Sequence, residues 1–198
     1  MNLSMKHVLG VSVGLLLCLS ARADWYVATE ANGGNDNNAG TADAPFLTIA
    51  KGVAAATAEV TAAGEGVSVV HVGEGEFPLT EQLVVSAAVE VRGAGRGKTF
   101  IKGKQNITGT YGGYSAVVLN HEQALLQDLM VYKNTYTVAQ NAWGLGVRLV
   151  KGTLRFCDIG SNTASGGPYR VHGGGVYMES GLIDHCVITN NVLSGGGG

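Results

Sequence analysis

Three stretches near the C-terminal end of the chain repeat one pattern: LQDLMVYKN at residues 126–134, LRFCDIGSN at 154–162 and IDHCVITNN at 183–191. The copies are offset by 28 and 29 residues, with apolar residues or cysteine at the first, fourth and sixth positions and asparagine at the ninth. A period in this range predicts a solenoid, because a unit that cannot bury its own apolar face must stack on copies of itself.

An apolar pair precedes each copy, at positions 117 and 119, 147 and 149, and 176 and 178. Each coil is therefore expected to contain at least two strands separated by turns. The inward positions of the repeat break strict alternation, which predicts a bend at its third position, occupied by Asp128, Phe156 and His185. Aspartate suits such a bend better than the other two, since it tolerates unusual backbone angles.

Stacked strands lie about 4.7–4.9 Å apart, so equivalent residues of successive coils form ladders. Asn134, Asn162 and Asn191 predict an asparagine ladder at a turn, in which each amide donates to the next. Cys157 and Cys186 share one inward column. We expect two buried free thiols there. The Cβ atoms of parallel stacked side chains stay near the spacing of the strands, which is longer than the Cβ–Cβ distance that a disulfide prefers.

The N-terminal segment has the features of a cleavable signal peptide. A short apolar run follows Lys6 and His7, and Ala21-Arg22-Ala23 has the small-x-small form that signal peptidase reads. We therefore expect cleavage after Ala23, a secreted or cell-surface location and no transmembrane segment in the mature chain. Removal of residues 1–23 leaves 11 basic against 15 acidic residues, a net charge near −4, which argues against a nucleic-acid partner.

Residues 24–64 are expected to form an N-terminal strand at 24–28, a loop and a helix. Five apolar residues from Phe46 to Val60 fall at spacings of three and four, which predicts one face of a helix that ends at Gly64. Such a helix would cap the first coil of a solenoid over residues 65–198, whose open apolar end would otherwise be exposed. Further short strands are expected at 67–72, 83–85, 89–91 and 99–101, with a glycine-rich turn at 73–77.

The segments at residues 35–41, 44–49 and 67–77, followed by coils that end in asparagine, resemble the start of secreted bacterial proteins of the pectate-lyase-like superfamily. This resemblance implies a right-handed parallel β-helix with a short N-terminal capping α-helix. It implies no single activity, because the superfamily includes polysaccharide lyases, glycoside hydrolases and non-catalytic surface passengers.

Polysaccharide lyases of this fold resemble one another in placing calcium-binding acids and an Arg or Lys base on the outside of one strand face. The corresponding outward columns here hold scattered acids: Gln127, Arg155 and Asp184 in one, and Met130, Asp158 and Val187 in the other. Calcium takes six to eight oxygen ligands. We therefore predict no catalytic residue and no cofactor in this segment, and interpret Arg155 and Asp184 as an exposed ion pair.

Two loops carry the remaining candidates. The candidate calcium site is an oxygen-rich loop that consists of Asn35, Asp36, Asn37 and Asn38. Turn formation is the simpler interpretation of these residues. The second candidate is a sugar-binding surface. It combines residues of a loop expected at 160–175 with two aromatic residues that precede this loop, and it consists of Tyr136, Trp143, Tyr169, Arg170 and His172. Aromatic rings stack on the apolar faces of sugars while His and Arg supply hydrogen bonds, although such residues are also ordinary on secreted surfaces.

The chain stops at residues 195–198, where the glycines of another coil begin, so we expect the N-terminal piece of a longer protein. The leading hypothesis is a secreted or surface-displayed β-helix scaffold without catalysis in this segment, presenting loops to a polysaccharide or cell-surface glycan. The alternative is the N-terminal part of a polysaccharide lyase or glycoside hydrolase that acts on polyuronides.

Overall fold

The computed structural model describes residues 24–104, 115–137, 141–165 and 170–194. Short strands dominate these residues, together with one α-helix, α1 (Ile49–Ala63), and one 3-10 turn, η1 (Glu30–Asn32). The strands are β1 (Trp25–Val27), β2 (Ser68–Val72), β3 (Gly75–Pro78), β4 (Leu83–Val85), β5 (Val89–Gly93), β6 (Thr99–Lys102), β7 (Val117–Gln127), β8 (Met130–Tyr132), β9 (Thr135–Thr137), β10 (Ala142–Trp143), β11 (Val147–Arg155), β12 (Asp158–Gly160), β13 (Thr163–Ser165), β14 (Val171–His172), β15 (Val176–Met178), β16 (Leu182–Asp184), β17 (Val187–Thr189) and β18 (Val192–Ser194).

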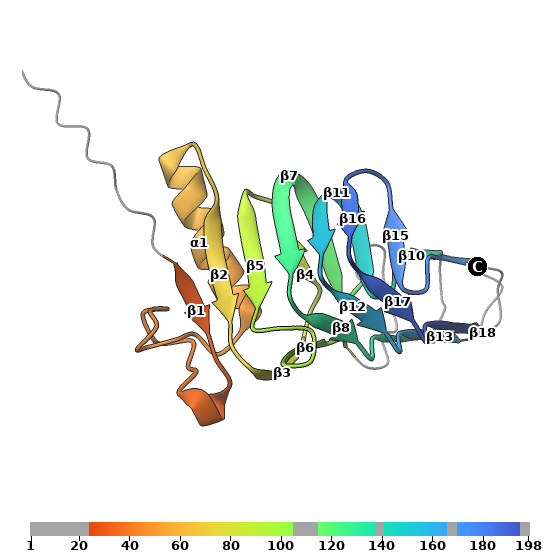
Figure 1. The fold of residues 1–198 in the computed structure, drawn as a ribbon, viewed down its shortest axis with the longest axis horizontal. Helices are drawn as coiled ribbons and strands as arrows, with labels where there is room; N and C mark the ends of the chain where they lie inside the picture. The colour runs from red at the N-terminus through yellow and green to blue at the C-terminus, as the bar shows by residue number, and fades with distance from the viewer. Residues whose placement is uncertain (1–23, 105–114, 138–140, 166–169, 195–198) are drawn as a thin grey trace, which may run out of the picture.

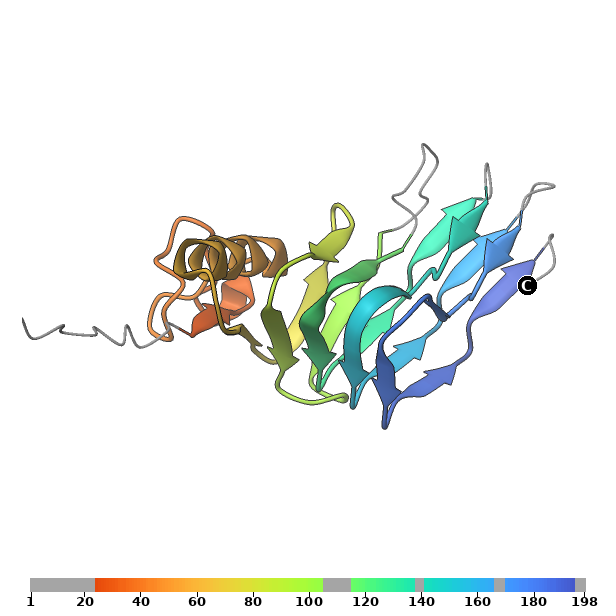
Figure 2. The ribbon, with the colours of Figure 1, turned by 90° about the horizontal axis from the view of Figure 1, so that it is seen from above.

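All the strand pairs are parallel, and they form sheets that run along the axis of the molecule (Figure 1). The largest sheet follows the order β1-β2-β5-β7-β11-β15, with β4 and β16 beside it; a second follows β17-β12-β8-β6-β3, and a third β18-β13-β9. Seen from above, the helix lies at one end of the molecule, and successive coils follow it side by side along the long axis (Figure 2). This is the parallel β-helix that the sequence predicts.

The predicted columns are confirmed by the strand register. Leu154 pairs with Leu126 on one side and with Ile183 on the other. Ile159 in the same way pairs with Val131 and with Ile188. Leu126, Leu154, Val131 and Ile159 are all fully buried, so these columns form the continuous apolar core.

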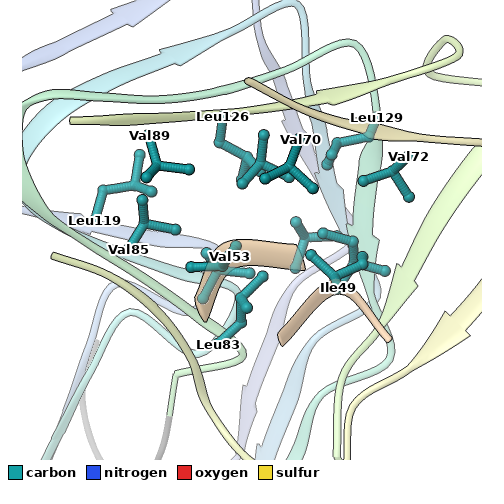
Figure 3. Close-up of a cluster of buried hydrophobic side chains, with 14 of the residues drawn as sticks. Ile49, Val53, Val70, Val72, Leu83, Val85, Val89, Leu119, Leu126 and Leu129 are labelled. Atoms are coloured by element: carbon teal, nitrogen blue, oxygen red, sulfur yellow. The ribbon is translucent and has the colours of Figure 1, made fainter. Parts of the chain in front are cut away.

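α1 closes one end of that core. Thr48 caps its first turn by accepting a hydrogen bond from the Lys51 amide at 3.2 Å. The helix ends at Gly64 as expected, and Gly64 has the left-handed conformation. Figure 3 shows Ile49 and Val53 of the helix pointing into the same cluster as side chains of the coils. Phe46, expected on the helical face, instead precedes the helix, where it bridges to Val27 and stacks on Trp25.

Left-handed residues form two further columns at the corners of the coils. The predicted bend is present, since Asp128, Phe156 and His185 have φ of 58°, 48° and 51°. A second set was not anticipated from the sequence; it lies just before the asparagines and consists of Lys133, Ser161 and Asn190. The stacking of neighbouring coils thus holds even a phenylalanine in a conformation that costs an ordinary residue roughly 1–2 kcal/mol.

Replacing Phe156 by asparagine is expected to raise the free energy of unfolding by about 1 kcal/mol, because asparagine tolerates positive φ. Urea unfolding measures the change. Phe100→Asn is the matched control, since Phe100 lies within the regular strand β6, and it should destabilise the protein. A loss of stability in Phe156→Asn would show that the contact between the Phe156 and His185 rings, 5.1 Å apart, outweighs the relief of strain.

The coils vary in length without losing register. β7 has 11 residues and β11 has nine, yet Leu119 pairs with Leu149 and Leu126 with Leu154. The difference is absorbed between these two pairs, where the ladder shifts at Lys151. An irregular corner therefore takes up the extra residues of β7.

Two expected turns or loops contain strands. The glycine-rich turn expected at 73–77 is largely the strand β3, and the loop expected at 160–175 includes β13 and β14. β13, β14 and their neighbours enclose a second, small core of Tyr136, Ala142, Leu145, Ala164 and Val171. Each of the later coils therefore has more strands than the repeat alone indicates.

The end of the stack opposite α1 leaves apolar side chains exposed on strands β15 to β18: Met178, Leu182, Val187, Ile188 and Val192. Continuation of the coils past residue 198 stays a prediction. In the part of the chain that the structure describes, no helix has the length and apolar character needed to span a membrane.

Candidate functional site

An aromatic face made of Trp143, His172 and Tyr177 lies on the outside of the later coils. β10 pairs in parallel with β14, which places Trp143 directly beside His172. Their rings are stacked, with centroids 6.2 Å apart and planes at 13°. The Tyr177 ring lies 6.5 Å from His172 and is tilted by 60°, so the face continues onto β15.

Local sequence explains why the rings point outward. Their strand neighbours Ala142 and Val171 are buried in the small core, and alternation then turns Trp143 and His172 to the other side. A glycine in the left-handed conformation follows each ring, Gly144 with φ of 61° and Gly173 with φ of 72°. These glycines turn the chain immediately into the next strand, which carries Tyr177 in the second coil.

A charged pair borders the aromatic face. Arg148 on β11 pairs in register with Tyr177 on β15. Its guanidinium donates two hydrogen bonds to Oε1 of Glu179, from Nε at 2.9 Å and from Nη2 at 2.6 Å. Both side chains remain about one-third exposed. The border of the face therefore has hydrogen-bonding groups but no net charge.

A second outward group, the bend cluster, gathers at the corner formed by the left-handed column; its members are Arg96, Arg155, Asp158, Asp184 and His185. Asp184 accepts from Nε of Arg155 at 3.1 Å, while its other oxygen lies 2.5 Å from Nδ1 of His185. Arg96 reaches across the coils to Oδ1 of Asp158 at 3.2 Å. The expected pair of Arg155 and Asp184 is thus part of a larger cluster.

Comparison with known proteins gives one family. Residues 32–198 match the model of a family described as protein of unknown function (DUF1565). The chain belongs to the DUF1565 family. The matched region includes the aromatic face, the bend cluster and α1. No curated protein and no solved structure matches the chain.

In this DUF1565 chain, the five residues expected to bind a sugar do not form one surface. Trp143 and His172 lie together in the aromatic face. Tyr136 is only 2% exposed and belongs to the small core, so its expected place on the surface is wrong. Arg170 is exposed, with its backbone amide bound to Asn141, and Tyr169 lies outside the described residues.

Sequence reasoning missed Tyr177 and Arg96. Tyr177 stands between the two residues of the predicted apolar pair at 176 and 178, so alternation alone would have placed it outward beside position 148. Arg96 is 62 residues from Asp158, and no pattern in the sequence links them.

The oxygen-rich loop uses its side chains to hold its own backbone. Asn35 accepts from the Asn37 amide, and Asn38 donates to the carbonyls of Gly33 and Pro45. Asp36 accepts the amides of Leu47 and Thr48 and the Thr48 hydroxyl, just before α1 begins; these three contacts are 2.8–2.9 Å long. Calcium binding here stays a prediction, and within the described ranges no three His, Cys, Asp or Glu residues gather as metal ligands would.

The asparagine and cysteine columns lie inside the stack. Oδ1 of Asn162 accepts the Asn134 amide at 3.0 Å, and its Nδ2 donates to Oδ1 of Asn191 at 2.9 Å. Cys157 and Cys186 are unbridged; the first is buried and the second half-buried. Burial raises the pKa of the Cys157 thiol, so it stays protonated at neutral pH.

A carboxylate on β3 is bound by two groups from the following coils. Glu76 accepts from Nζ of Lys102 at 2.8 Å and from the Tyr132 hydroxyl. These hydrogen bonds, the one from Lys102 first, lower the pKa of Glu76. Burial and then the bond to Glu76 raise the pKa of Tyr132 to about 12.

The raised pKa predicts a stability change in alkaline solution. A hydroxyl that holds its proton more tightly in the folded state stabilises fully below its ordinary pKa of 10.0, and this contribution is lost as the pH rises toward about 12. Melting curves over this range should show a smaller decline for Tyr132→Phe than for the natural protein, by less than about 1 kcal/mol because the pair is exposed. Tyr26→Phe is the control, and equal declines in all three proteins would contradict the prediction.

Proposed function

We propose that the protein is an exported β-helix scaffold that binds a glycan through the aromatic face. The stacking of Trp143 on His172 in neighbouring coils is the observation that carries the proposal. The exposed parts of the stacked rings form an apolar strip along the coils, against which the C–H faces of sugar units can pack. Arg148 and Glu179 at the border supply hydrogen bonds to hydroxyl groups.

The chemistry of the border favours an uncharged glycan. The Arg148 guanidinium is already neutralised by Glu179, so no free positive charge of this pair remains to attract a uronate. A net charge near −4 after cleavage of the leader also repels polyanions. Neutral polysaccharide is therefore the preferred ligand.

Trp143→Ala is expected to weaken binding of a neutral polysaccharide by at least about tenfold, because truncation of a central tryptophan commonly removes about 2 kcal/mol of binding free energy. Affinity electrophoresis in gels containing hydroxyethyl cellulose or xylan measures the change, with polygalacturonate as the charged comparison. Phe156→Ala is the matched control, since Phe156 is an exposed ring outside the aromatic face. Failure of the natural protein to bind any neutral polysaccharide, or equal binding by Trp143→Ala, would overturn the proposal.

The bend cluster supports a second candidate, a lyase or hydrolase of polyuronides. Asp184 lies beside Nδ1 of the His185 imidazole, an arrangement that suits a general base. Arg155 and Arg96 are paired with Asp184 and Asp158, so a uronate carboxyl group would have to share their guanidinium groups with these carboxylates. The test is incubation with polygalacturonate, followed by the absorbance of unsaturated products and by a reducing-sugar assay. Product formed by the natural protein and lost in His185→Ala supports this candidate, and absence of product removes it.

Export is part of the main proposal. The support is the leader at residues 1–23, whose removal leaves Asp24 as the first residue. Expression with the leader in a bacterium, followed by mass determination of the protein outside the cytoplasm, tests both the location and the cleavage site. A full-length protein that stays in the cytoplasm would contradict it.

A further inference from the structure

A cavity of 560 Å³ lies beside the N-terminus of α1, far along the stack from the aromatic face. Its walls come from η1, from the residues around Thr48 and from the connection between β3 and β4. This volume is within the range of small-molecule sites in proteins. The start of α1, η1 and the connection between β3 and β4 therefore enclose a preformed space.

The inner surface of the cavity is mainly apolar. Leu47, Pro78 and Leu79 contribute partly exposed side chains, and Phe77 lies beneath them, 4% exposed. The side chain of Leu47 is 36% exposed. An apolar ligand body entering here would cover these side chains and release the water that contacts them.

All the charged groups that line the cavity are carboxylates: Glu30, Asp36, Glu76 and Glu81. Two of them have partners, since Asp36 binds the amides at the start of α1 and Glu76 binds Lys102 and Tyr132. The side chains of Glu30 and Glu81 make no hydrogen bond or ion pair with any residue that the structure describes. The positive end of α1 is offset by Asp36, so it does not compensate these two charges.

We propose that this cavity binds a small organic cation, an ammonium group attached to an apolar body. The body would occupy the space over Leu47 and Leu79, and the ammonium group would lie at the rim near Glu30 and Glu81. An anion of the same shape meets only carboxylates there, and a neutral molecule gains nothing from them. The sign of the charge on the ligand is therefore the discriminating property.

Three probes with the same six-carbon body test this proposal: hexylammonium, hexanol and hexanoate. Isothermal titration or chemical-shift titration of the natural protein should show the ammonium binding at least about threefold more tightly than hexanol, and hexanoate binding most weakly. Each of Glu30→Gln and Glu81→Gln should weaken the ammonium about threefold and leave hexanol unchanged. Added salt should reduce only the difference between the probes.

Glu122→Gln is the matched control, because Glu122 is a well-exposed glutamate on β7 outside the cavity lining. Trp143→Ala should also bind hexylammonium normally, so failure at the aromatic face and failure at this cavity are separate results. Equal affinities for the three probes, an unchanged affinity in the double variant Glu30→Gln/Glu81→Gln, or no binding of hexylammonium would each overturn the proposal.

Discussion

Shortening Leu154 to alanine is expected to lower the free energy of unfolding by about 2–5 kcal/mol. Leu154 is fully buried in the middle of its column, with Leu126 on one side and Ile183 on the other. The lost methyl groups would leave a cavity that the rigid stack cannot close, since moving one rung displaces its paired neighbours. Urea unfolding followed by circular dichroism measures the change.

Val84→Ala provides the control for Leu154→Ala. Val84 is also in a short strand of the largest sheet, but its side chain is 43% exposed. Its truncation should cost less than about 1 kcal/mol, because little surface changes its environment. Similar losses in both variants would show that the apolar column is not the main source of stability.

Replacing Asn162 by alanine is expected to lower the free energy of unfolding by about 2–4 kcal/mol, because a buried amide loses its acceptor and a half-buried side chain loses one of its hydrogen bonds. Asn162 is fully buried. The variant leaves the Asn134 amide without its acceptor and Oδ1 of Asn191 without one of its donors. The same urea unfolding measurement applies, and the exposed Asn120→Ala is the control.

Asn162→Asp separates the roles of the two side-chain atoms. Aspartate keeps an acceptor for the Asn134 amide but, when ionised, cannot donate to Asn191 and carries a buried charge. Burial would raise its pKa, so this variant should be most stable in acid and lose stability as the pH rises. A loss below about 1 kcal/mol in Asn162→Ala at neutral pH would refute a stabilising role of the ladder.

The fold could be predicted because its main determinants are periodic. Three copies at offsets of 28 and 29 residues define which side chains share a column, and the register of β7, β11 and β16 confirms this. The capping helix has a three-and-four spacing and an end signal in Gly64. The strands β10 and β14 were missed because two residues are too few to show alternation.

The candidate site could be predicted only in part. Trp143 and His172 were grouped because both belong to the residues between coils, whereas Tyr136 has the same aromatic character and lies in the small core. Composition does not distinguish an inward ring from an outward ring when the strand itself is not recognised. The bend at Phe156 could be expected only from its column with Asp128 and not from the residue itself, because contacts between coils override the preference of phenylalanine.

The irregular corner in the ladder of β7 and β11 also determines where the length of the chain can change without disturbing the core. The nine-residue and 11-residue strands hold the same ladder on both sides of the corner, so an insertion there shifts no core residue. New surface segments could therefore be added at this place, by evolution or by grafting, while the pitch of the coils stays constant. The spacing between coils is therefore constant, while the length of each outward segment can differ from coil to coil.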